Sequence, residues 1–199
     1  EACDPCTEDN SESWDKTLAG TGAITVDYGT ALRGSQSLQV VGSGDSYSTI
    51  KSPEFTAQDT IYGFLRINLA DGQPATTNEL VHILDGDSAV VGKVSVMTTG
   101  VVRVYNGTTY SASTTALPDG ATGTYYVWFY WSKDPAANDS GTMGIEVNNS
   151  RTFGAWEDED TTETADTQAT SIMIRDRYIQ GVVADQVLIK TTAIGTVCE

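Results

Sequence analysis

The chain has 199 residues, of which 19% are charged and 39% hydrophobic, and its formal net charge is −16. This composition is typical of a folded protein and excludes a disordered chain, and the length suits one well-buried domain over residues 1–199. The negative charge argues against a nucleic-acid partner, because phosphate binding needs a basic surface, and no apolar run reaches the roughly 20 residues that insert across a membrane.

The three cysteines lie at the two ends of the chain, at Cys3, Cys6 and Cys198. A disulfide from Cys3 or Cys6 to Cys198 would tie the polar N-terminal segment 1–22 to the C-terminus, and chain entropy gives it about 4–5 kcal/mol as an upper estimate. Because such bonds form in oxidising compartments, we expect a secreted, extracellular protein. The alternative, a Cys3–Cys6 redox or metal pair, lacks the second pair of ligands that zinc needs.

Beyond residue 22, apolar and polar residues alternate with the period of two that is typical of β-strands. Turn residues such as Asp85–Gly86–Asp87 and Asn106–Gly107 separate these segments, and no apolar pattern at helical spacing persists for three turns. We therefore predict an all-β fold, a two-sheet antiparallel β-sandwich or jelly roll. Its predicted strands lie at 24–28, 38–40, 47–51, 62–69, 79–84, 90–97, 101–105, 125–133, 143–147, 172–178 and 182–190.

One predicted strand, Tyr125–Lys133, has bulky residues on both of its faces. Alternation places Tyr125, Val127, Phe129 and Trp131 on one face, and Tyr126, Trp128 and Tyr130 on the other. An ordinary half-buried strand has one apolar and one polar face. The second aromatic face therefore either contacts a ligand or is covered by another part of the chain, and the sequence leaves both alternatives open.

The same alternation along the neighbouring strands places several of the chain's few cationic residues on the side that holds these rings. The chain has only eleven Lys and Arg and one His. Aromatic rings stack on the apolar side of sugars, polar groups bind the hydroxyls, and cations favour uronate or sulfate groups. We therefore predict a polysaccharide-binding face made of Arg66, Asn68, His82, Lys93, Ser95, Arg103, Tyr105, Tyr126, Trp128 and Tyr130.

Three segments of the chain resemble the concanavalin A-like, laminin-G-like jelly rolls of extracellular carbohydrate-binding and carbohydrate-cleaving proteins. They are ALRGSQSLQV at 31–40, the segment from Val81 to Tyr105 with its Leu-Asp-Gly turn and VVRVY strand, and GTYYVWFYW at 123–131 followed by GIEVN at 144–148. The closing segment ADQVLIK at 184–190 is similar to the last strand of that family. The resemblance implies a jelly roll whose concave sheet face binds a polysaccharide or oligosaccharide.

The resemblance also implies roles in catalysis and in metal binding. His82, with Tyr105 or Tyr178 and Arg66, resembles the base, acid and carboxylate-neutralising set of β-eliminating polysaccharide lyases. Its surroundings are Val81–His82–Ile83, without the Q-I-H motif of alginate lyases, and a lone His in a strand is more often structural. A structural Ca²⁺ is implied between the last strand and the start of the chain, with candidate ligands Asp185, Glu8, Asp9 and Glu12. Asp85 and Asp87 are a rival pair, although Asp-Gly-Asp is more often a turn.

Three classes of function follow in order of preference. The first is a secreted domain that binds a polysaccharide, uronate-containing or sulfated; the second is a lyase that cleaves a uronate-containing chain; the third is an adhesion or structural module. A glycoside hydrolase would need two opposed carboxylates, and the acidic string Glu157–Asp160 with Glu163 is better explained as a solvated loop.

Overall fold

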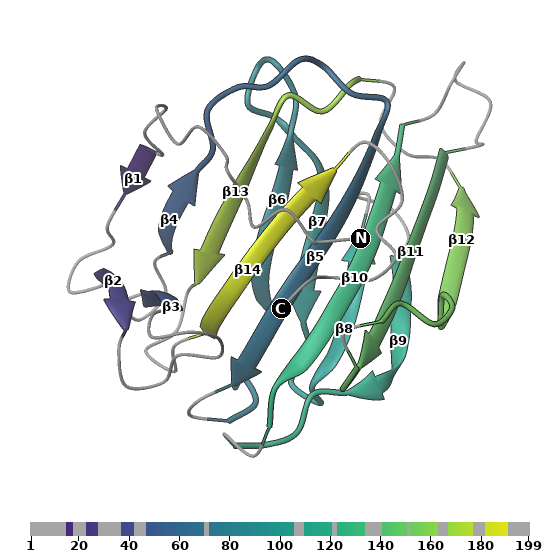
Figure 1. Cartoon of the computed structure of the whole chain (residues 1–199). Helices are drawn as coiled ribbons and strands as arrows, with labels where there is room; N and C mark the ends of the chain where they lie inside the picture. Colours follow the sequence, from purple (N-terminus) through teal and green to yellow (C-terminus); the bar gives the residue numbers. More distant parts are fainter. Residues whose placement is uncertain are drawn as a thin grey trace, which may run out of the picture.

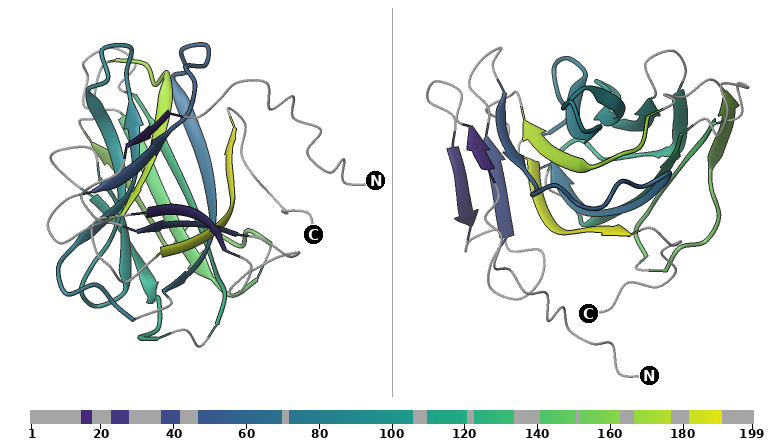
Figure 2. Two further views of the ribbon diagram at one scale, coloured as in Figure 1. Left: turned by 90° about the vertical axis from the view of Figure 1, so that its left-hand side faces the viewer. Right: turned by 90° about the horizontal axis from the view of Figure 1, so that it is seen from above.

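Two antiparallel sheets of seven strands each make up the described part of the chain (Figure 1). The computed structural model describes residues 15–17, 23–27, 37–41, 47–69, 72–105, 110–120, 123–133, 141–150, 152–162, 167–176 and 182–190. The sheets lie face to face as two layers (Figure 2). The predicted all-β sandwich is therefore confirmed. Within these residues, no helix is long and apolar enough to cross a membrane.

The two sheets, called sheet A and sheet B below, are both assembled from strands that are distant in sequence. Sheet A has the order β1 (Asp15–Thr17), β4 (Ser48–Lys51), β13 (Ser171–Asp176), β6 (Asn78–Leu84), β7 (Val90–Val96), β8 (Val101–Tyr105) and β9 (Tyr110–Ala116). Sheet B has the order β12 (Asp158–Thr162), β11 (Gly141–Asn148), β10 (Tyr125–Ser132), β5 (Thr60–Leu69), β14 (Val182–Lys190), β3 (Ser37–Val41) and β2 (Ala23–Asp27). The consecutive strands β13 and β14 lie in different sheets, which is the kind of crossing that jelly rolls use.

The core lies between the sheets and is built from one face of each strand. Phe129 and Trp131 of β10 are fully buried there. Glycines make room for both rings, because an added Cβ would lie 1.9 Å from the Phe129 ring at Gly63 and 2.9 Å from Trp131 at Gly92. The same layer contains Leu65, Ile67, Val81, Ile83, Val94, Val96, Val102, Val104, Val127, Ile145 and Val147.

The acidic segment after residue 157 was predicted to be a solvated loop, and for Asp158–Thr162 this was wrong. These residues form β12, the edge strand of sheet B. Glu157 accepts hydrogen bonds from the backbone N–H groups of Thr114 and Thr115 at 2.7 and 3.1 Å, and Asp158 accepts one from Ala112 at 2.8 Å. The carboxylates therefore satisfy the backbone N–H groups along an edge of β9. This strand is rich in Ser and Thr and has no alternating apolar pattern, so it was not predicted.

The close approach of Phe129 to Gly63 generates a prediction about stability. A Gly63→Ala substitution should lower the free energy of unfolding by about 1–3 kcal/mol, since the new methyl group would overlap a fully buried ring. Denaturant unfolding would measure the loss. Gly86→Ala is the matched control, because a Cβ there meets nothing within 4 Å. Equal midpoints for the two variants would contradict this account of the core.

Candidate functional site

The residues predicted to share one binding face are divided between the two sheets. His82, Lys93, Ser95, Arg103 and Tyr105 lie on β6, β7 and β8 of sheet A. Arg66 and the three rings Tyr126, Trp128 and Tyr130 lie on β5 and β10 of sheet B. Both sets point away from the shared core, so they occupy opposite outer faces of the sandwich. The prediction of one common face was wrong, because alternation tells which residues of a strand share a side but not which sheet the strand joins.

The aromatic set on sheet B is covered by the chain itself. Trp128 is 0% exposed, and Phe64 packs against it with ring centroids 5.1 Å apart. Phe153 and Trp156, in the segment after β11, lie over Trp128 and Tyr130 at centroid distances of 6.4 and 4.8 Å. The covered alternative is therefore the observed one, and Trp128 has no exposed face on which a sugar could stack.

Arg66 also belongs to this buried face and is 6% exposed. Its register partner on β10 is Tyr126. The prediction that it works beside His82 was therefore wrong, because the whole core of the sandwich separates the two residues. Asn68 lies on the same strand, but its side chain is outside the described residues.

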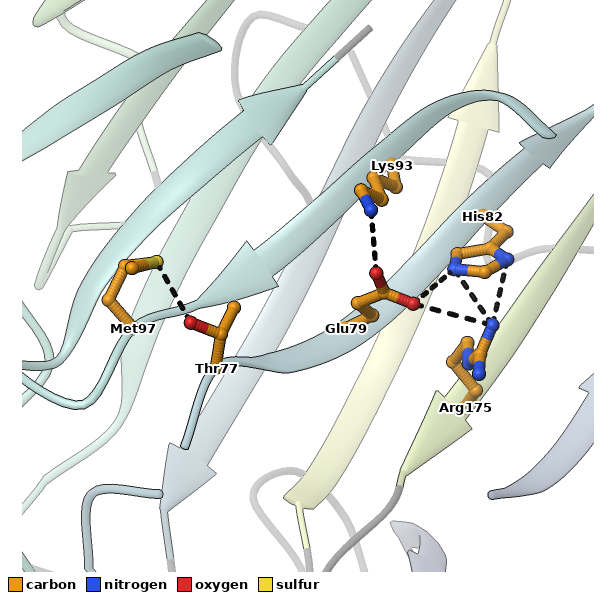
Figure 3. Close-up of polar contacts among 6 residues, drawn as sticks. All are labelled: Thr77, Glu79, His82, Lys93, Met97 and Arg175. Atoms are coloured by element: carbon orange, nitrogen blue, oxygen red, sulfur yellow. Dashed lines mark hydrogen bonds and ion pairs between the residues drawn. The ribbon is translucent and has the colours of Figure 1, made fainter. Parts of the chain in front are cut away.

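Three polar side chains lie around the chain's one histidine on the outer face of sheet A (Figure 3). We call Glu79, His82, Lys93 and Arg175 the histidine cluster. Glu79 Oε2 lies 2.9 Å from His82 Nε2, and Glu79 Oε1 accepts a hydrogen bond from Lys93 Nζ at 2.6 Å. Arg175 Nη1, on β13, lies 2.9 Å from His82 Nδ1, 2.8 Å from Nε2 and 3.5 Å from Glu79 Oε2.

Glu79 joins this cluster because of an irregularity in β6. The register with β7 shifts between Glu79 and Val81, so Leu80 turns into the core and is 2% exposed. By strict alternation from His82, Glu79 would have faced the core, and for that reason it was missed. Arg175 was also missed, although alternation around the buried Ile172 and Ile174 places it on the outer face.

The contacts around His82 favour a neutral imidazole. A guanidinium has only donors, so Arg175 needs a ring nitrogen with a lone pair. We assign that lone pair to Nδ1, which leaves Nε2–H to donate to Glu79. Burial has the largest effect on the pKa of His82 and lowers it from 6.5; the bond to Glu79 raises it and the charges of Arg175 and Lys93 lower it. His82 is therefore uncharged at neutral pH and holds a basic nitrogen.

The carboxylate of Glu79 is held in its ionised form by the same contacts. The hydrogen bond from His82 is the largest effect, and with Lys93 it outweighs burial and lowers the pKa of Glu79 to about 2 from 4.5. A depressed carboxylate pKa means that the contribution of Glu79 to stability is complete above pH 4.5 and is lost as the pH falls toward 2. The Glu79 carboxylate is therefore negatively charged near neutral pH and binds the basic side chains of the cluster.

A hollow of about 280 Å³ adjoins the histidine cluster on the same face. Two cations stack on tyrosine rings at its wall: Lys93 Nζ lies 4.8 Å from the centroid of Tyr105, and the guanidinium carbon of Arg103 lies 3.8 Å from that of Tyr110. Tyr110 is 45% exposed. The hollow is lined by Thr77, Glu79, Lys93, Ser95, Met97, Arg103, Tyr105 and Tyr110.

The calcium prediction falls largely outside the described residues. Of the candidate ligands, Glu8, Asp9 and Glu12 are not described, and neither is the side chain of Asp185 on β14. Tyr178, the candidate acid of a lyase, also lies outside the described residues. Where side chains are described, no group of three or more His, Cys, Asp or Glu could hold a metal. Asp85 forms a turn, since its Oδ1 accepts hydrogen bonds from the N–H groups of Asp87 and Ala89 at 3.0 and 2.8 Å. The Ca²⁺ site therefore stays a prediction.

Comparison with known proteins identifies the fold. No family model and no curated protein sequence matches the chain. Among solved structures, an endo-β-1,4-glucuronan lyase from the fungus Trichoderma reesei matches with a TM-score of 0.65 and 13% identity over 90% of this chain and 91% of that one. The cellulose induced protein Cip1 gives 0.62 and 14% over 92% and 93%. The carbohydrate-binding module CBM66 from Bacillus subtilis gives 0.51 and 15% over 89% and 94%. With its two seven-stranded sheets, the chain has the concanavalin A-like jelly-roll fold, as the sequence predicted.

Proposed function

We propose that the protein binds an acidic polysaccharide on the outer face of sheet A, and that uronate residues of the polysaccharide lie against the hollow and the histidine cluster. One observation carries this proposal. In a chain of net charge −16, Lys93 and Arg103 line one hollow whose single lining carboxylate is Glu79, and Arg175 lies 3.5 Å from that carboxylate.

The chemistry of the face suits a charged sugar. The exposed ring of Tyr110 and the ring of Tyr105 offer surfaces for the apolar side of a pyranose, while Ser95 and Thr77 offer hydroxyl groups to its polar edge. Guanidinium and ammonium groups bind carboxylates through charge-assisted hydrogen bonds, which are about twice as strong as neutral ones. Sheet A therefore combines stacking with charge recognition, whereas the rings of sheet B are covered.

The structural neighbours support the same class of ligand. One is named for cleavage of glucuronan and another for carbohydrate binding. At identities of 13% and 15% they share the fold with this chain, and fold alone does not fix function. The proposal therefore rests on the side chains of sheet A, with the neighbours as support.

Chain cleavage by β-elimination is the second candidate, and the state of His82 favours it. A neutral imidazole with a basic Nδ1 suits a general base, and Glu79 would stabilise the imidazolium that forms. In this step Arg175 moves from Nδ1 to the uronate carboxylate, the freed Nδ1 takes the C5 proton of the uronate, the C4–C5 double bond forms, and the C4–O4 bond breaks. Arg175 would neutralise the uronate carboxylate in place of the predicted Arg66, and Tyr105, or Tyr178 as predicted, would protonate the leaving oxygen.

Binding to an acidic glycan is the first test of this function. Titration calorimetry should detect binding of oligoglucuronate, and Arg175→Gln should weaken it by about tenfold or more because a charge-assisted hydrogen bond is lost. Lys133→Gln is the control, since it removes the same charge where Lys133 contacts Asp59 at 3.5 Å. Equal affinities for oligoglucuronate and an uncharged glucan would contradict the proposal.

Cleavage has a separate readout. If the lyase candidate is right, incubation with polyglucuronate should produce the ultraviolet absorbance of an unsaturated uronate, and His82→Ala should abolish it because the base is removed. Oligoglucuronate binding by the same variant would show that its face is still folded. Wild-type protein that binds the polymer without producing this absorbance would exclude the second candidate and leave the first.

The pKa of His82 gives a third test, which does not depend on any ligand. Because the chain has one histidine, a single imidazole signal can be followed by NMR as the pH changes. Glu79→Gln should lower the pKa of His82 further, since Glu79 raises it, and Arg175→Gln should increase it, since the charge of Arg175 lowers it. Shifts in the same direction for both variants would contradict the arrangement described for the histidine cluster.

A further inference from the structure

We infer that Arg103 forms a second carboxylate subsite, which binds a uronate other than the one held at the histidine cluster. This inference rests on the proposed function, because it assigns part of the same face to a further sugar of the bound chain. It also goes further, since it makes acidic groups on at least two sugars a requirement for tight binding.

The charges on sheet A are unevenly compensated. Lys93 and Arg175 both lie near Glu79, at 2.6 and 3.5 Å from its carboxylate oxygens. Among the described side chains, no carboxylate lies within ion-pair distance of Arg103, and its buried Nε has no hydrogen-bond partner there. A partly buried cation without an anion is costly. A carboxylate brought by a ligand would remove this cost at Arg103, whereas at Lys93 or Arg175 it would compete with Glu79.

The position of Arg103 prepares it for a planar anion. Its guanidinium stacks on the ring of Tyr110 at 3.8 Å, and stacking uses the face of the group while its N–H edge stays available for donation. Its register partners are Ser95 on β7 and Ala112 on β9, so small side chains flank it on both sides. Arg103 lines the hollow, where its paired N–H groups match the two oxygens of a carboxylate.

The spacing on the sheet separates the two subsites. His82 lies on β6 and Arg103 on β8, two strands away, which corresponds to roughly 10 Å across the sheet. A single sugar ring is too short to reach both, whereas a disaccharide spans a distance of this size. Arg175 lies on β13, one strand beyond β6 and so still farther from β8. The uronate at Arg103 is therefore a different residue of the polysaccharide from the uronate at Arg175.

The test compares oligoglucuronate with the same oligosaccharide after its carboxyl groups have been reduced to alcohols. Calorimetry should give Arg103→Gln an affinity for oligoglucuronate about 10- to 100-fold weaker than wild type. Its affinity for the reduced oligosaccharide should match that of wild type. Arg103→Lys keeps the charge but not the paired N–H groups, so its affinity for oligoglucuronate should lie between those of wild type and Arg103→Gln. Lys133→Gln, distant from the hollow, should bind both ligands as wild type does.

The outcomes distinguish this inference from the proposal beneath it. If wild type binds oligoglucuronate and both Arg103→Gln and Arg103→Lys bind it as tightly as wild type does, the second subsite is overturned and the proposed function stands. Equal losses for both oligosaccharides in Arg103→Gln would also overturn it, because the residue would then act on the shape of the hollow and not on a carboxylate. Wild type that does not bind oligoglucuronate would overturn the proposed function itself.

Discussion

The register shift in β6 between Glu79 and Val81 decides what the outer face of sheet A can do. A regular strand would place Leu80 toward solvent and Glu79 in the core, where an ionised carboxylate would be very costly. The shift buries Leu80 and brings Glu79 within 2.9 Å of His82 and 2.6 Å of Lys93. One backbone irregularity thus stabilises the core and supplies the carboxylate that organises three basic side chains, in keeping with the tendency of bulges to occur next to functional sites.

The electrostatics of the face follow from that single carboxylate. Glu79 accepts from His82 and Lys93 and therefore stays ionised, while the positive charge of Arg175 beside the ring disfavours a charged imidazole. Glu79 balances only part of the positive charge, because Arg103 lies beyond its reach on β8. The face is thus divided into a compensated region around His82 and an uncompensated one around Arg103, and each would interact differently with a polyanion.

Alternation along the chain was sufficient to predict eleven of the strands and to place His82, Lys93, Arg103 and Tyr105 on outward positions. It was insufficient where residues depend on sheet membership, since the register between distant strands is a long-range property. Trp128 and His82 are therefore on different sheets, although alternation places both of them on the outward side of their strands. The position of Glu79 depends on a bulge that the sequence does not mark. The strand β12 is held by hydrogen bonds that backbone N–H groups of β9 donate to Glu157 and Asp158, and no local apolar pattern predicts them.

The two outer faces of the sandwich show why only one of them is suited to a ligand. On sheet B the buried Glu146 accepts bonds from Gly154 N and from Asn148 Nδ2 at 3.0 and 2.8 Å, and Phe153 and Trp156 cover the rings. On sheet A a hollow remains and Arg103 has no anion among the described residues. The net charge of −16 repels a polyanion at long range, but salt screens exposed charges beyond about 10 Å at 0.1 M. The proposed binding would then depend on short contacts to Arg103, Lys93 and Arg175, because they act well inside that distance.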